Sequence, residues 1–245
     1  MPRLYIDAPI IPNQSFILKD APFNHAIRVL RLQIKDEIVL FNGTGGEYLA
    51  IITSIDKKHA VLQVLDFNPI ERESSLNLHL YQALAKGDKL DYILQKATEL
   101  GVNSITLLIS KRSIAAIAEE RLDKKMAHFR SIIISACEQC GRNTLPVLEL
   151  PLKLHKLNLS SELNYLTLDP KAEDKLSDSI KVSTKGATHK NIALIIGPEG
   201  GLSPDELDLL SKKGCQSINL GARILRTETA AIAVIAALQA LFGDW

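Results

Sequence analysis

The chain has 245 residues, of which 46% are hydrophobic and 23% charged, with a formal net charge of +1. This length allows one large or two modest domains, each with its own core. No stretch approaches about 18 uninterrupted apolar residues, so we expect no membrane-spanning helix. Three cysteines cannot form a disulfide framework, and the first residues lack the apolar segment of a signal peptide, so we expect a cytoplasmic protein.

Residues 1–70 contain short runs of β-forming residues separated by turn residues. This spacing predicts a small β-barrel domain. Asn42–Gly46, with three glycines that tolerate positive φ, is typical of a hairpin loop. The predicted strands are Leu4–Ile6, Ser15–Leu18, Glu37–Phe41, Tyr48–Ile52 and Ala60–Leu65.

A short helix between Ala21 and Leu32 carries basic or titratable residues at intervals of three. His25, Arg28 and Arg31 would lie on one face of that helix. Two interpretations stay open: a row of side chains that contacts RNA phosphates, or an ordinary solvated surface. A net charge near zero requires any RNA-binding surface to be a local patch of this kind.

Residues 68–75 are polar and contain a proline, which predicts a linker, and a second domain follows over residues 74–245. Strands and helices alternate there, which predicts a mostly parallel sheet covered on both faces. Residues 171–190 show no clear period and are expected to form a surface excursion. The expected strands and helices are Leu76–Leu84, Asp88–Leu100, Ile105–Ile109, Glu119–Gln139, Val147–Leu148 and Tyr165–Leu168.

Two successive segments near the C-terminus combine a strand, a glycine turn and a helix. Leu194–Ile196 is a buried strand by composition, and Gly197-Pro198-Glu199-Gly200-Gly201 follows as a turn. Ser203, Pro204 and Glu206 then supply an N-cap, an N1 proline and a capping-box glutamate. Gly214 is placed to end this helix.

The second segment has a strand at Ser217–Leu220, a turn at Gly221 and an apolar helix that ends near Phe242. Arg226 and Glu228 lie where this helix begins, close to buried surface, where an unpaired charge is costly. A ligand, a partner or each other must satisfy them. Two such loops at one edge of a parallel sheet predict a small-molecule site.

Together the two motifs, GPEGG-x-S-x-x-E and LG-x-RILR-x-ETA, resemble the SPOUT methyltransferases. More narrowly, they resemble the RsmE family of small-subunit ribosomal RNA uridine-N3 methyltransferases. The segment His25–Arg31 with Phe41–Tyr48 is similar to the PUA-like RNA-binding domain of that family. Lys86-Gly87-Asp88, followed by QKATELGV, is similar to the start of its catalytic domain.

The resemblance implies a SPOUT-type fold, knotted as a trefoil, behind a PUA-like β-barrel, with S-adenosyl-L-methionine as the cofactor. It implies that three loops bind this cofactor: the segment after Leu168, the first glycine turn and the segment Leu220–Ala230. It further implies a homodimer, of which the last helix forms part of the interface. The implied cofactor residues are Leu168, Gly197, Pro198, Glu199, Gly200, Gly201, Leu220, Gly221, Ile224, Leu225, Arg226, Thr229 and Ala230.

Methyl transfer to uridine N3 requires removal of the N3 proton or stabilisation of the resulting anion. Arg226 is the candidate for stabilising charge on the uracil oxygens, and Glu199 or Glu228 is the candidate proton acceptor. An alternative for Glu228 is a structural ion pair with Arg226. Lys89, Lys96 and Glu99 lie on or near one helix after the KGD motif. Such residues more often form a solvated face than a site, but the resemblance favours a site here.

Further contacts with 16S ribosomal RNA, or with the small ribosomal subunit, are expected from polar groups at strand and helix ends. These candidates are Lys86, Arg112, Glu138, Gln139 and Arg142, which add to His25, Arg28 and Arg31. Cys137 and Cys140 spell CxxC, but further ligands at zinc spacing are missing, so no metal is expected.

Two other functions of the chain stay open. One is a SPOUT ribose 2′-O-methyltransferase, which the N-terminal barrel and the KGD motif disfavour. The other is an RNA-binding ribosome-assembly factor without catalytic activity. Mass spectrometry of nucleosides would identify the first, and a lack of stabilisation by the cofactor would favour the second.

Overall fold

The computed structural model of the protein describes residues 1–113, 117–177 and 191–245. The chain forms two compact units. The first consists of residues 1–73 together with Ile134–Leu145, and the second of Ser74–Ile133 and Pro146–Trp245. The first unit therefore contains the predicted domain 1–70 and adds a segment from the middle of the sequence.

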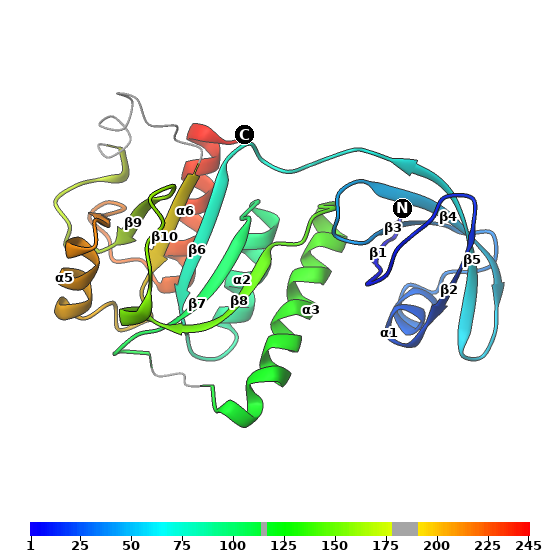
Figure 1. The fold of residues 1–245 in the computed structure, drawn as a ribbon, viewed down its shortest axis with the longest axis horizontal. Helices are drawn as coiled ribbons and strands as arrows, with labels where there is room; N and C mark the ends of the chain where they lie inside the picture. The colour runs from blue at the N-terminus through cyan, green and yellow to red at the C-terminus, as the bar shows by residue number, and fades with distance from the viewer. Residues whose placement is uncertain (114–116, 178–190) are drawn as a thin grey trace. The chain divides into compact units, whose positions relative to one another are not determined.

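A five-stranded sheet in the order β1-β3-β4-β5-β2 forms the first unit (Figure 1). β1 is parallel to β3, and the other neighbours are antiparallel. β1 and β2 are the two edges of this sheet. The strands are β1 (Arg3–Tyr5), β2 (Ser15–Lys19), β3 (Glu37–Phe41), β4 (Glu47–Ile55) and β5 (His59–Asn68).

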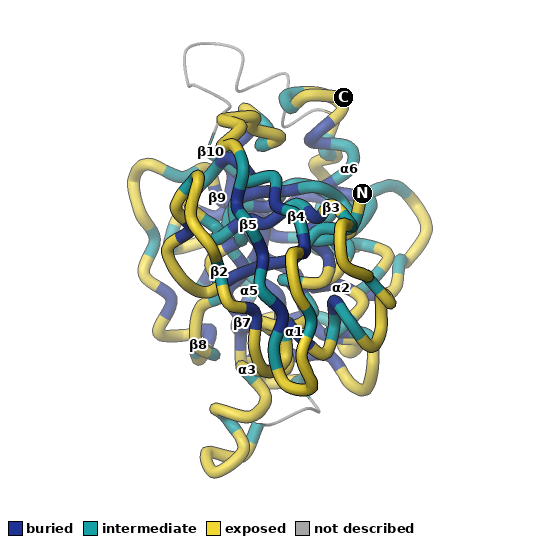
Figure 2. Tube along the Cα trace, turned by 90° about the vertical axis from the view of Figure 1, so that its right-hand side faces the viewer, coloured by how far each residue is buried: buried dark blue, intermediate teal, exposed yellow. Residues whose placement is uncertain are grey.

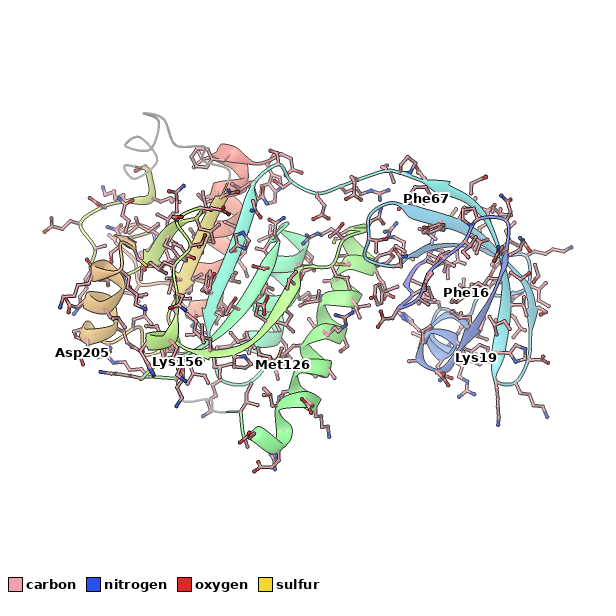
Figure 3. The ribbon with its side chains drawn as sticks, in the orientation of Figure 1. Phe16, Lys19, Phe67, Met126, Lys156 and Asp205 are labelled. Carbon is pink, nitrogen blue, oxygen red and sulfur yellow. The ribbon has the colours of Figure 1, made fainter. Side chains whose placement is uncertain are left out.

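Alternate residues of these strands fill the core of the first unit. Leu40, Ala50 and Leu62 are fully buried within it. The predicted hairpin loop joins β3 to β4, and Gly46 has φ +67°. A Cβ at Gly46 would lie 2.4 Å from the ring of Phe67, which is labelled on this sheet in Figure 3, so only glycine fits.

The predicted short helical segment between Ala21 and Leu32 is present, but it changes type along its length. It consists of α1 (Asp20–Phe23) and the π-helix η1 (Asn24–Val29). Arg31 lies beyond the C-cap in a left-handed conformation, with φ +57°. The prediction that His25, Arg28 and Arg31 share one helical face is therefore wrong for Arg31.

The second unit contains a six-stranded sheet in the order β11-β9-β10-β6-β7-β8, and every neighbouring pair is parallel (Figure 1). This confirms the predicted parallel α/β class. Residues 105–108 and 192–196 of the central strands are buried without a break, so these strands are covered on both faces; Figure 2 colours buried residues dark blue. The strands are β6 (Asn77–Ala83), β7 (Ser104–Ile109), β8 (Val147–Lys153), β9 (Asn164–Leu168), β10 (Asn191–Ile196) and β11 (Gln216–Ile218).

Helices α2 (Lys89–Glu99) and α6 (Thr227–Phe242) pack against each other behind the sheet in Figure 1. The side chain of Gln239, on α6, is 1% exposed and donates to the backbone oxygen of Leu100 at 2.8 Å. The Cβ of any residue replacing Gly101 would lie 2.8 Å from Gln239 Nε2. The glycine that ends α2, as predicted, therefore also permits this close packing.

Helix α5 (Pro204–Lys212) begins and ends as its sequence predicts. Ser203 and Glu206 form a reciprocal capping box, and Gly214 has φ +98° just after the helix. Helix α5 lies next to η3 (Leu154–Lys156). Figure 3 labels one residue of each, Asp205 in the first turn of α5 and Lys156 in η3. The long predicted helix is also present, as η2 (Glu119–Arg121) and α3 (Leu122–Cys140).

The connection from β9 to β10 carries the predicted surface excursion 171–190. Most of it, 178–190, lies outside the described residues, so the trefoil threading stays an expectation. The described part runs beside the segment after β11, where Leu176 N–H donates to Asn219 O at 3.2 Å and Asn219 N–H to Asp174 O at 2.8 Å. Within the described chain, no helix is long and apolar enough to cross a membrane.

Candidate active site

The three loops predicted to bind the cofactor leave one edge of the parallel sheet. β9 ends at Leu168, β10 at Ile196 and β11 at Ile218, and these strands are consecutive in the sheet. The carboxyl ends of parallel strands meet at a common edge, where α/β folds bind ligands. The next strand, β6, contributes the segment Leu84–Asp88 to the same edge.

Thr227, the first residue of α6, connects two of these loops. Its hydroxyl donates to Gly197 O at 2.7 Å and accepts a hydrogen bond from Gln82 Nε2 at 3.0 Å. Thr227 is 5% exposed and Gln82 is fully buried, so solvent does not replace these bonds. The first glycine turn, the start of α6 and the end of β6 are therefore fixed together.

The third loop is also held against its neighbour. Asp169 N–H donates to Ile218 O at 3.0 Å, and Asn219 Nδ2 donates to Ala172 O at 2.7 Å. The side chain of Asn219 also accepts from Gly221 N–H at 2.9 Å. The segment after Leu168 and the segment that begins at Leu220 thus lie side by side.

The glycine turn after β10 is compact, and its glycines permit the close backbone approach and the positive φ that this requires. A Cβ at Gly197 would lie 2.9 Å from Leu202 N, and Gly201 has φ +68°. Gly201 N–H donates to Pro198 O at 2.8 Å, which closes the turn. Glu199 and Gly200 are exposed at its tip.

A basic side chain at the start of α2 joins the two candidate carboxylates. Lys89 Nζ lies 3.2 Å from Glu199 Oε1 and 3.9 Å from Glu228 Oε2. Lys89 is the first residue of α2, which follows the carboxyl end of β6. Its position directly after the KGD motif, at a strand end, is the signal that could have identified it. Lys89 is 35% exposed, and its two ion pairs favour a role at the site over an ordinary solvated face.

Arg226 lies at the N-cap of α6 and is exposed. The ion pair found for Glu228 is the one with Lys89, so the alternative pairing of Glu228 with Arg226 is not what the geometry shows. Arg226 is left facing solvent next to the glycine turns. Ile224, which precedes it, is 84% exposed.

Comparisons with known proteins agree on one family. An RNA methyltransferase domain matches residues 72–239, and an RNA methyltransferase PUA domain matches residues 18–65. Ribosomal RNA small subunit methyltransferase E from Buchnera aphidicola is 34% identical over 100% of this chain and 95% of that protein. The enzyme of the same name from Rickettsia conorii is 35% identical over 98% of this chain and 95% of its own length. The chain belongs to the ribosomal RNA small subunit methyltransferase E family.

Solved structures agree with this membership in the methyltransferase E family. The methyltransferase E of Neisseria gonorrhoeae, bound to S-adenosyl methionine, is 36% identical, covers 100% of this chain and 99% of its own, and has a TM-score of 0.90. A Legionella pneumophila protein in complex with the cofactor SAM is 38% identical, covers 99% and 98%, and has a TM-score of 0.93. The predicted SPOUT-type fold is therefore confirmed.

Among the residues predicted to contact RNA in this methyltransferase E family member, Arg112 supports the glycine turn. Its guanidinium donates to Gly200 O at 3.0 Å and to Leu202 O at 3.3 Å. The neighbouring Lys111 N–H donates to Glu206 Oε1 at 2.7 Å. Glu206 thus serves both the capping box and the loop after β7. The side chain of Lys86 is exposed at the same sheet edge, and its backbone N–H donates to Glu199.

The other predicted RNA contacts lie in the first unit. Arg28 and Arg31 are exposed, and His25 Nδ1 lies 3.8 Å from Glu138 Oε2. Gln139 is exposed at the end of α3.

Arg142 and Glu138 hold the first unit together. Arg142 is 4% exposed, and its guanidinium donates to Glu73 at 3.0 and 2.5 Å. Glu138 accepts from Tyr5 N–H at 3.0 Å, and burial raises the pKa of its carboxyl group. Burial and pairing argue against the predicted RNA contacts of these two residues. Both partners are distant in sequence, which is why the residues around Glu138 and Arg142 did not reveal them.

A cavity of about 500 Å³ lies beside α5, away from the glycine turns, and its lining includes Ser110, Lys153 and His155. Two of its lysines form ion pairs, Lys111 with Asp205 and Lys212 with Asp208, each at 2.7 Å. In residues 1–113, 117–177 and 191–245, no cluster of three or more His, Cys, Asp or Glu side chains could hold a metal ion.

Proposed function

We propose that this chain is an S-adenosyl-L-methionine-dependent methyltransferase that modifies N3 of a specific uridine in 16S ribosomal RNA of the small subunit. Its relatives carry the name of that enzyme over their full length, and a similar structure contains the cofactor. The single observation that carries the proposal is the Thr227 bond to Gly197. It joins the two loops whose sequences carry the family resemblance.

The described residues fit this cofactor. S-adenosyl-L-methionine presents hydrogen-bond donors, and Gln82 Oε1 is a buried acceptor without a hydrogen-bond partner at this sheet edge. We assign the cofactor to the segment after Leu168, to Gly197–Gly201 and to Leu220–Ala230. When bound, it supplies an electrophilic methyl group.

The chain's own residues have four tasks in this reaction. The loops hold the reactants and exclude water, which raises the effective concentration of the reacting groups. Arg226, exposed at the N-terminus of α6, stabilises negative charge on the uracil oxygens, and the helix dipole adds to it. A carboxylate, Glu199 or Glu228, takes the N3 proton. The exposed Arg28, Arg31 and Lys86 bind flanking RNA phosphates.

We further propose a homodimer that works in the cytoplasm. α6 is not buried on all sides within one chain, contrary to the uniform burial that its sequence suggests. Val234, Ile235 and Leu238 are fully buried, whereas Ile232 and Ala236 are half-buried and Leu241 is 55% exposed. A second copy would cover this remaining apolar side. Light scattering after gel filtration measures the mass, and a monomer would refute this part.

The experiment that tests the function is methyl transfer into small ribosomal subunits from cells that lack this protein. We expect incorporation of one methyl group, and mass spectrometry of the nucleosides should show 3-methyluridine. A 2′-O-methylated nucleoside would instead establish the ribose methyltransferase. In parallel, S-adenosylhomocysteine at 100 times its Kd should stabilise the protein by about 2.7 kcal/mol. A lack of both effects would leave a non-catalytic RNA-binding protein.

A further inference from the structure

Three charged side chains from three separate elements meet at the proposed site. Lys89 comes from α2, Glu199 from the turn after β10, and Glu228 from the first turn of α6. Lys89 lies 3.2 Å from Glu199 and 3.9 Å from Glu228. Two carboxylates share a single ammonium group, and the geometry makes this sharing unequal.

The carboxylate of Glu199 already has hydrogen-bond partners. Its Oε1 accepts from Lys86 N–H at 3.0 Å and from Lys89. Burial by itself would raise the pKa of Glu199, but the backbone N–H groups of Glu199 and Lys86, together with Lys89, lower it. A carboxylate stabilised in this way is a weak base. It is well suited to hold the tip of the glycine turn against the end of β6.

Glu228 has a different environment. Its Oε2 is buried and lacks a hydrogen-bond partner, and Lys89 approaches it only to 3.9 Å. The side chain is 17% exposed, and this exposure belongs to atoms other than Oε2. Oε2 of Glu228 thus faces Lys89 beyond hydrogen-bond distance and keeps lone pairs that no described group occupies. The charged groups that the described structure places around it are Lys89 and Glu199, with Arg226 two residues earlier in the chain.

Building on the proposed function, we propose that Glu228 accepts the N3 proton of the target uridine, and that Lys89 and Glu199 are positioning residues that orient it. Two carboxylates in one site with contrasting surroundings commonly divide the roles of structural anion and proton acceptor. Glu199 takes the first role because its lone pairs are engaged. Glu228 takes the second because it retains capacity to accept a proton.

Atoms and electrons balance in this proton transfer. The N3–H bond breaks, and its proton forms an O–H bond with the Glu228 carboxylate. The electron pair left on N3 forms the bond to the methyl carbon, while the carbon–sulfur bond breaks and its electrons stay on sulfur as a neutral thioether. Glu228 then releases the proton to water. Lys89 keeps the two carboxylates from repelling each other while Glu228 is ionised.

The test compares Glu228→Gln with the wild-type protein in methyl transfer to small subunits and in calorimetric binding of S-adenosylhomocysteine. We expect kcat to fall about 100-fold or more, with binding of S-adenosylhomocysteine within about threefold of wild type. Residual turnover should rise with pH, because hydroxide must then remove the N3 proton. Glu228→Asp, which keeps a carboxylate, should recover part of the rate and also guards against misfolding of the glutamine variant.

The positioning role of Lys89 has its own matched variants. Lys89→Met should lower kcat about tenfold or more, and Lys89→Arg should restore part of it. Glu99→Gln is the control, since Glu99 lies on the same helix and pairs with Lys96 at 2.8 Å. We expect no change of rate in this control variant.

Specific results would overturn the assignment. Wild-type turnover in Glu228→Gln would exclude Glu228 as the acceptor. Equal losses of turnover and of S-adenosylhomocysteine binding would make Glu228 a cofactor ligand instead. If only this assignment is wrong, the wild-type protein still methylates uridine N3. A wild-type protein that did not methylate uridine N3 would refute the proposed function itself, so the two failures are distinguishable.

Discussion

The hydroxyl of Thr227 offers the most direct test of the proposed site. Thr227→Val keeps the shape of the side chain but removes the donor to Gly197 O and the acceptor of Gln82 Nε2. Gln82 Nε2 keeps its second bond, to Ala83 O at 3.0 Å. Each buried polar group left unpaired costs about 1–3 kcal/mol, so we expect the free energy of unfolding to fall by about 2–4 kcal/mol. At about 2–4 °C per kcal/mol, Tm falls by about 5–15 °C.

The assay combines thermal unfolding with calorimetric binding of S-adenosylhomocysteine. Because the two loops lose their connection, we expect affinity to fall about tenfold or more, which is about 1.4 kcal/mol. Thr227→Ser is the control, since it keeps the hydroxyl and loses only a methyl group. Its affinity should stay near that of wild type. A valine variant as stable and as tightly binding as the serine variant would refute the reasoning.

Three other predictions concern charged residues. Arg226→Ala should abolish methyl transfer to small subunits while circular dichroism and dimer mass stay unchanged; wild-type turnover would remove Arg226 from the mechanism. Replacing Arg28 and Arg31 by alanine should weaken RNA binding and reduce the slope of log K against log salt by about 0.7–0.9 for each phosphate that the variant no longer neutralises; an unchanged slope would indicate ordinary surface. Burial alone would raise the pKa of Glu47, but hydrogen bonds, chiefly from Arg72, hold this pKa below the ordinary 4.5. The Glu47 carboxylate therefore stabilises the fold above pH 4.5, and this stabilisation is lost as the pH falls through the lowered pKa. Glu47→Gln should therefore lower Tm at pH 7, and this difference should shrink below pH 4.5; a constant difference would contradict the ion-pair explanation.

Local features of the fold were predictable from the sequence. The capping box of Ser203 and Glu206 and the glycine ends of α2 and α5 depend on residues within a few positions of each other. Their physical causes are a side-chain cap and a positive φ, and a single residue type indicates each of them. The strand-glycine-helix order similarly predicted which loops would meet at the sheet edge.

Features that depend on distant pairs were not predictable. Lys89 reaches Glu199 and Glu228 only because β6 and β10 are neighbours in the sheet, an order that no local pattern encodes. Arg142 looked available for RNA because its partner, Glu73, lies 69 positions away.

The helix that carries Arg28 shows a third kind of limit. A spacing of three residues implies a shared face only for a regular helix, and the segment Asn24–Val29 is a π-helix that ends before Arg31. Periodicity identified a helical segment there. It could not identify how tightly the segment is wound.

The composition of the first unit has a consequence for cutting the protein into pieces. Residues 1–73 and Ile134–Leu145 belong to one compact body, although 60 residues of the second unit separate them in the chain. A fragment that begins at Ser74 would keep Arg142 but lose Glu73, its carboxylate partner. This arginine is 4% exposed in the intact protein, and the fragment would lose its ion pair with Glu73. Deletion of the N-terminal residues therefore removes structural contacts as well as the proposed RNA-binding residues. Low stability or low activity of such a fragment would say little about catalysis.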